Sequence, residues 1–251
     1  MDRAGIEDRL RALGIALGAA LAGILSAVVL TLVAVLVVSG LGVGLGVIGS
    51  VLLTLALTAG VAFGGVSLAY VRYRGLGRSF IGVRLPTPRD LAWVGGGYLL
   101  AFLSVLVASV LVGLIGADPA PNQLSQAGLE EPALLLLLVP ISLFLVGPGE
   151  ELLFRGVVQG TLRRSFGPVG AVTIAAAIFA SVHFVALTGG VSARLTTIAI
   201  LFLPSLVFGA AYERTGNLAV SALIHGLYNS TLAVLLYVGL AYGSVPQGLV
   251  G

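Results

Sequence analysis

Three short groups of polar residues interrupt apolar stretches of this sequence. The first lies in "EELLFR", the second closes "FASVH" and the third spans "HGLYN". The residues are Glu150, Glu151, Arg155, His183, His225 and Asn229. A carboxylate with imidazoles is suited to activating water as a general base, and an amide donor nearby can stabilise an oxyanion. The reaction class that these residue types suggest is peptide-bond hydrolysis.

Spacing assigns different roles to the two glutamates. Glu151 and Arg155 are four residues apart, so on a helix they share a face and can pair. Glu150 is rotated by about 100° from its neighbour and has no cation at helical spacing. His225 and Asn229 are also four apart, which places them one turn from each other on one face. We therefore expect Glu150 to be available for chemistry and Glu151 to be held in an ion pair.

Other protease designs lack their residues in this chain. There is no "HExxH" sequence of the zincin type, and Asp occurs only near chain ends or in connections, at 2, 8, 90 and 118. The chain has no Cys, and all 13 basic residues are Arg. An aspartyl dyad, a thiol nucleophile and a Ser/Lys dyad are therefore excluded.

Composition predicts the elements that must position these residues. The chain is 58% hydrophobic and 9% charged, whereas a soluble domain carries roughly 25% charged residues. Its apolar runs reach the roughly 20 residues of a membrane-spanning helix and lack the alternation of barrel strands. We predict an all-α polytopic transmembrane helix bundle of about seven spans, with six to eight as the range. The expected spans are 12–38, 44–71, 91–117, 133–162, 169–188, 195–212 and 217–243.

The distribution of Arg predicts the orientation of these spans. Connections rich in Arg stay in the cytoplasm. A cytoplasmic N-terminus places eleven of the thirteen Arg on that side, leaving Arg194 outside and Arg155 within a span. We expect a multi-pass protein of the cell membrane. The net charge of +3 is small and explained by topology, so no nucleic-acid partner is expected.

Inserting a charged side chain at the centre of a bilayer costs about 2.5–3.5 kcal/mol. The ionisable residues in the fourth, fifth and seventh spans therefore require a structural or functional explanation. Gly147, Pro148 and Gly149 precede the acid pair and predict a break in the helix, because Pro removes a backbone donor. Irregular backbone at this depth survives only beside protein or a watery cavity. We expect a cavity wall facing the cytoplasm, with the acids and histidines roughly 12–21 Å deep.

The three groups together resemble the EExxxR, FxxxH and HxxxN/D motifs of the CPBP family. These are the type II CAAX prenyl proteases and their prokaryotic, bacteriocin-processing (Abi) relatives. The resemblance covers about 140–235, within a motif-bearing core expected at 133–243 of a single integral membrane domain, 1–251. It implies that Glu150 and His183 activate water and that His225 and Asn229 bind the oxyanion or help to hold a metal. The supporting residues that it implies are Glu151, Arg155 and Phe179.

The cofactor stays open at this point. Two His and one or two Glu can ligate Zn²⁺ and leave a position free for water, and the metalloprotease-like label of the family favours a metal held by Glu150, His183 and His225. The same residues can also act without one.

The substrate class and two rival functions also stay open. The resemblance implies a peptide or membrane-protein substrate in the lipid bilayer, prenylated or carrying a C-terminal recognition signal. Intramembrane Glu, His and Arg also build the relays of proton-coupled transporters, and a non-catalytic membrane scaffold or immunity protein is a third alternative. Intact motifs argue against the scaffold, and the lack of a clear second broken helix argues against the transporter.

Overall fold

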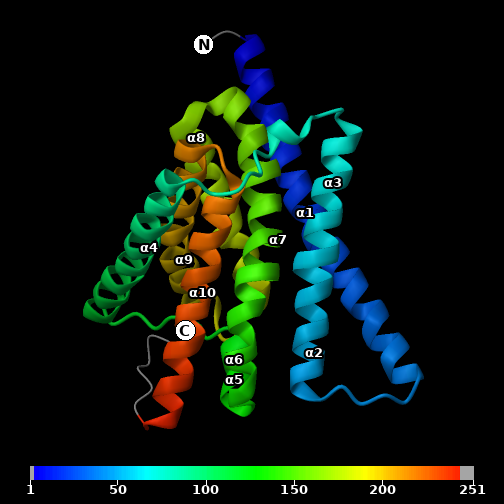
Figure 1. Cartoon of the computed structure of the whole chain (residues 1–251), viewed down its shortest axis with the longest axis vertical. Helices are drawn as coiled ribbons and strands as arrows, with labels where there is room; N and C mark the ends of the chain where they lie inside the picture. Colours follow the sequence, from blue (N-terminus) through cyan, green and yellow to red (C-terminus); the bar gives the residue numbers. More distant parts are fainter. Residues whose placement is uncertain (1–2, 244–251) are drawn as a thin grey trace.

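The computed structural model describes residues 3–243, which form a bundle of long helices joined by short connections (Figure 1). The α-helices are α1 (Arg3–Gly40), α2 (Gly46–Leu55), α3 (Gly64–Tyr73), α4 (Pro88–Leu114), α5 (Gln123–Glu130), α6 (Pro132–Ile141), α7 (Gly147–Glu151), α8 (Gly160–Val182), α9 (Val191–Thr215) and α10 (Leu218–Ala241). Wider π-helical turns join some of them without a break, at Ala56–Phe63, Ser142–Val146 and Leu152–Gln159. The described chain is therefore an all-α polytopic bundle, as predicted.

Within residues 3–243, six helices are long and apolar enough to cross a membrane. The fourth, Pro132–Ala186, has 55 residues, which at 1.5 Å per residue is about 80 Å and far exceeds a hydrocarbon core of about 30 Å. Gly167 bends it, with φ 69° and ψ 180°. The second limb returns along the first, since the Phe154 and Phe179 ring centroids lie 5.0 Å apart. These helices therefore cross seven times, within the predicted range.

The connections rich in Arg gather at one end of the bundle. There, Arg9 Nε donates to the Ser165 carbonyl, and Arg84 Nη2 donates to the Thr215 carbonyl. Other connections meet at the opposite end of the bundle, where the Thr188 N–H donates to the Pro121 carbonyl. This grouping agrees with the expected sidedness, and which compartment each end faces stays a prediction.

The helix does not break before the acid pair, so this part of the sequence prediction is wrong. Gly147, Pro148 and Gly149 all lie in the helical run Pro132–Ala186. The Gly147 N–H donates to Ser142 O, five residues back. Because the preceding turn is π-helical, we infer that its wider ring makes room for the proline that would clash in an ordinary α-turn.

The two glycines instead allow close packing around the acid pair. A Cβ on Gly147 would lie 2.7 Å from Ala222 O in α10, and a Cβ on Gly149 would collide with Ala59 O in the π-helical segment Ala56–Phe63. Backbone from two other spans thus approaches directly beside Glu150 and Glu151. Among the six spanning helices α10 is the most enclosed, 56% buried in its most apolar stretch against 11% for α1. The site is therefore built around the most enclosed helix.

Candidate active site

The two acids end α7 side by side, but their surroundings differ. The Glu151 side chain is completely buried, whereas 17% of the Glu150 side chain is accessible. Arg155 Nε donates to Glu151 Oε2 at 2.9 Å, and the guanidinium is also completely buried. The predicted pair is therefore present, and Glu150 is the more accessible carboxylate.

Arg155 is held by more than its ion pair. Its Nη2 donates to Ser205 Oγ of α9 at 3.0 Å. Its guanidinium carbon lies 5.0 Å from the Phe179 ring centroid and 6.0 Å from that of Phe208, distances at which cations attract aromatic faces. These contacts compensate for burying a charge that would otherwise be costly.

His225 lies between the two carboxylates. Its Nδ1 is 3.0 Å from Glu151 Oε1, and its Nε2 is 3.9 Å from Glu150 Oε2. Because Glu151 is already paired as a carboxylate, it accepts, and Nδ1–H donates. The His225 ring stacks on Phe208, with centroids 4.9 Å apart and planes 16° from parallel. Nε2 is thus directed toward Glu150 at a distance that leaves no direct hydrogen bond.

His183 is fixed by the backbone of its own helix. It begins the 3₁₀ turn His183–Ala186 after α8, and its Nδ1 lies 2.8 Å from Phe179 O. A carbonyl oxygen only accepts, so Nδ1 carries the proton and Nε2 keeps a free lone pair. The Phe179 ring packs against both histidines, 4.7 Å from His183 and 5.6 Å from His225 between centroids. Through its contacts with both rings, Phe179 therefore connects His183 to His225 and the acid pair.

Asn229 follows His225 by one turn of α10 and is half-buried. Its side chain makes no hydrogen bond within residues 3–243. An uncommitted amide next to the reacting groups can donate to a substrate oxygen.

The metal set considered from sequence does not fit this arrangement. Across the described part of the chain, no three His, Asp or Glu side chains gather closely enough to hold a metal ion. The hydrogen bonds of the two Nδ1 atoms, His225 to Glu151 and His183 to a carbonyl, do not bear on this, because they leave both Nε2 atoms available. The chemistry below is therefore derived from these side chains alone.

A polar ladder, which the motifs did not indicate, connects the site to the Arg-rich end. Its three rungs join the π-helical segment and the start of α8 to α9: Arg155 to Ser205, Gln159 to the Gly209 carbonyl at 3.0 Å, and Arg163 to Glu213. Partners on each side are four residues apart. The sequence signal was the run of polar residues at 151, 155, 159 and 163 within an apolar helix. Glu151 continues this ladder to His225.

Fold and site together define a polytopic helical membrane protein with a buried acid–histidine centre. Residues 132–231 match the family model described as type II CAAX prenyl endopeptidase Rce1-like. This segment includes the acid pair, both histidines and Asn229, and the match supports the resemblance to CAAX proteases drawn from the sequence. No curated protein and no solved structure matches the chain significantly.

Proposed function

We propose that this chain hydrolyses a peptide bond near the cytoplasmic side of the cell membrane, with water activated by Glu150 and His183. The family supports an intramembrane endopeptidase in general. The observation that carries the finer proposal is the position of His225, which lies between Glu151 at 3.0 Å and Glu150 at 3.9 Å. The Glu150 side chain keeps 17% of its surface accessible, as a general base must.

The proposed chemistry begins with water between Glu150 and His183 Nε2. Glu150 removes one proton as the water oxygen attacks the carbonyl carbon of the scissile bond. Negative charge then develops on the carbonyl oxygen, where Asn229 donates a hydrogen bond and His225, when doubly protonated, donates a second one from Nε2. When the C–N bond breaks, the proton held by Glu150 passes to the leaving nitrogen, which departs as an amine. The carboxylate is regenerated, and no group is oxidised or reduced.

Depth along the helices supports a site nearer the Arg-rich end. His225 lies seven residues after the start of α10 and Glu150 thirteen residues before Arg163, which is roughly 10–20 Å at 1.5 Å per residue. A peptide or membrane protein reaching in from that end is the proposed substrate. Prenylation or a C-terminal signal on this substrate is part of the proposal, on family grounds.

The test is cleavage of a quenched peptide library by purified protein in detergent. We expect cleavage by the native chain and none by Glu150→Gln. The same assay is run after dialysis against a chelator, where activity should persist because three ligands do not converge. Loss on chelation with recovery on Zn²⁺ would contradict the metal-free mechanism. Equal activity of native chain and Glu150→Gln would contradict the proposal itself.

A further inference from the structure

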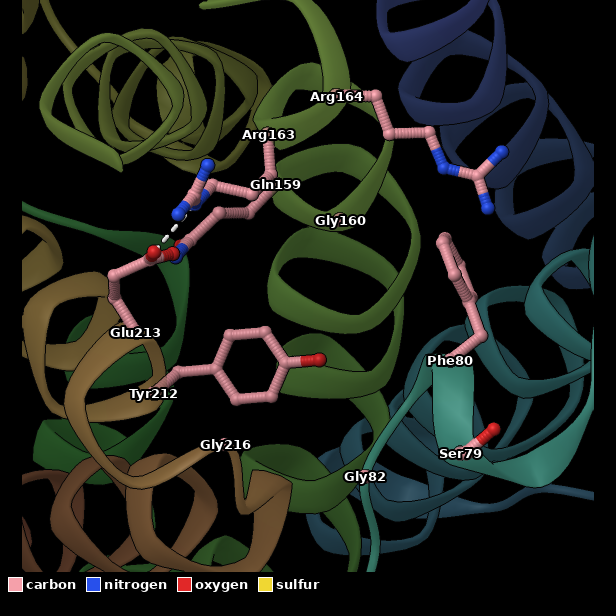
Figure 2. Close-up of a pocket in the computed structure, with 10 residues that line it drawn as sticks. All are labelled: Ser79, Phe80, Gly82, Gln159, Gly160, Arg163, Arg164, Tyr212, Glu213 and Gly216. Atoms are coloured by element: carbon pink, nitrogen blue, oxygen red, sulfur yellow. Dashed lines mark hydrogen bonds and ion pairs between the residues drawn. The ribbon is translucent and has the colours of Figure 1, made fainter. Parts of the chain in front are cut away.

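A pocket of about 290 Å³ lies at the Arg-rich end of the bundle, away from the acid–histidine centre (Figure 2). Its walls come from the connection before α4, from the start of α8 and from the end of α9. Figure 2 shows Gln159, Arg163 and Glu213 together on one side, with Phe80 on the other. This volume is at the low end for small-molecule sites, about 300–1,000 Å³. It suits a small polar group rather than a bulky ligand.

The rim carries more positive than negative charge. Arg163 Nε donates to Glu213 Oε1, and 46% of the Arg163 side chain is accessible. Arg164 has no acidic partner among residues 3–243, and its guanidinium carbon lies 5.1 Å from the Phe80 ring centroid. The rim therefore carries two guanidinium groups and one carboxylate, with Arg163 turned toward Glu213 and Arg164 beside Phe80 on the other side (Figure 2). Arginine forks match phosphate oxygens in geometry and charge.

The inner end of the pocket offers an acceptor without a partner. Gln159 is completely buried; its Nε2 donates to the Gly209 carbonyl, and its Oε1 has no hydrogen-bond partner. A buried acceptor left alone costs about 1–3 kcal/mol. A ligand hydroxyl that reached this buried oxygen would remove that cost. The pocket thus combines sites for an anion and for a hydroxyl donor.

The location of the pocket narrows the class of ligand. It lies among the Arg-rich connections, which the expected orientation places at the level of the cytoplasmic lipid head groups. Basic pockets between spanning helices at the cytoplasmic side bind anionic head groups. The ring of Tyr212 in its wall is of the kind enriched at that level.

We propose that this pocket binds a glycerophosphate group, with the phosphate at Arg163 and Arg164 and a glycerol hydroxyl toward Gln159. An anionic phospholipid and free glycerol 3-phosphate share this chemistry. The proposal is independent of the hydrolase activity, because the pocket residues are outside the acid–histidine centre.

The experiment measures phosphatidylglycerol retained on the purified full chain by native mass spectrometry, with phosphatidylcholine as the competing lipid. The variant with both Arg163→Gln and Arg164→Gln should retain phosphatidylglycerol about tenfold more weakly, since each surface charge contributes attraction. Glu213→Gln should strengthen retention, because it removes the only carboxylate at the rim. Arg194→Gln, at the opposite end of α9, is the matched control and should change nothing.

A displacement experiment identifies whether the bound phosphate belongs to a lipid or to a free ligand. Displacement of the lipid by glycerol 3-phosphate assigns a free phosphate ligand, and resistance assigns the lipid. Gly160→Leu tests the pocket without changing charge, because a Cβ there already lies 3.0 Å from Phe80; a folded Gly160→Leu should lose retention. Retention unchanged in the double variant, weakened by Glu213→Gln, or equal for phosphatidylcholine overturns the proposal. Displacement by a peptide carboxylate but not by glycerol 3-phosphate overturns it as well.

Discussion

Glu150 and Glu151 are adjacent in sequence, yet burial separates their roles. Glu150 keeps an accessible carboxylate and has no ion-pair partner closer than His225 Nε2 at 3.9 Å. Replacing it with Gln preserves shape and removes the base. We expect Glu150→Gln to lower the cleavage rate by at least about 100-fold, which is the usual contribution of a general base. Its melting temperature should stay close to that of the native chain, and a folded, fully active variant contradicts the assignment.

Glu151→Gln should behave differently, because it leaves the Arg155 charge buried without its partner. Breaking a buried ion pair from one side costs about 3–5 kcal/mol. We expect a clearly lower melting temperature in detergent. Adding Arg155→Met should restore much of the stability, because removing both charges avoids the unpaired one.

Activity separates a purely structural pair from a positioning role for Glu151. The same carboxylate accepts from His225 Nδ1–H, so the stabilised double variant should still cleave poorly. Recovery of both stability and cleavage in the double variant would show that Glu151 has no part in orienting His225.

Sequence predicted the local part of this site and not the contact across helices. The Glu151–Arg155 pair follows from a four-residue spacing. The bond between Glu151 and His225 joins residues 74 apart, and no local pattern contains that distance. Ser205 was missed for the same reason, since a single hydroxyl in an apolar helix has many ordinary explanations.

At the scale of elements, close packing around the acid pair depends on glycine. A Cβ on Gly149 would meet the Ala59 carbonyl oxygen, which is backbone and cannot rotate away. We expect Gly149→Ala to destabilise the protein by about 1–3 kcal/mol, as overpacking does. Gly95→Ala in α4 is the control, since nothing lies within 4 Å of its added Cβ. It should leave the melting temperature unchanged or raise it; equal effects of both changes would contradict the packing role.

The glycine–proline sequence shows where pattern reading fails. Taken alone, Gly and Pro at 147–149 indicate a break in the helix. The structure continues the helix through them, so the expected exposed helix end does not exist. We infer that the π-helical turn before α7 accommodates the proline, and neighbouring backbones explain the glycines. Both causes are tertiary. The short helix α5, which lies outside the seven expected spans, has instead a local cause, the cap that Asn122 provides to the Ser125 N–H.

The whole molecule was the most predictable level, because length and hydropathy limit a membrane chain to few arrangements. Uncharged stretches of spanning length predicted seven crossings, and the bend at Gly167 is consistent with the short connection expected between 162 and 169. The polar run on the first side of the ladder is visible in the sequence, but its partners on α9 were not predictable, since the rungs join residues fifty positions apart.

The orientation of the bundle is the remaining prediction at this scale. The chain has no native Cys, so single cysteines report sidedness without background. Leu85 is 90% exposed at the Arg-rich end, and Glu130 is exposed in α5 at the other end. A membrane-impermeant thiol reagent added to intact cells should label Glu130→Cys and spare Leu85→Cys, while both should react after lysis. The expectation follows because Arg-rich connections are retained in the cytoplasm. The reverse labelling would place the phosphate pocket outside, and substrate would then reach the acid–histidine centre from the external face.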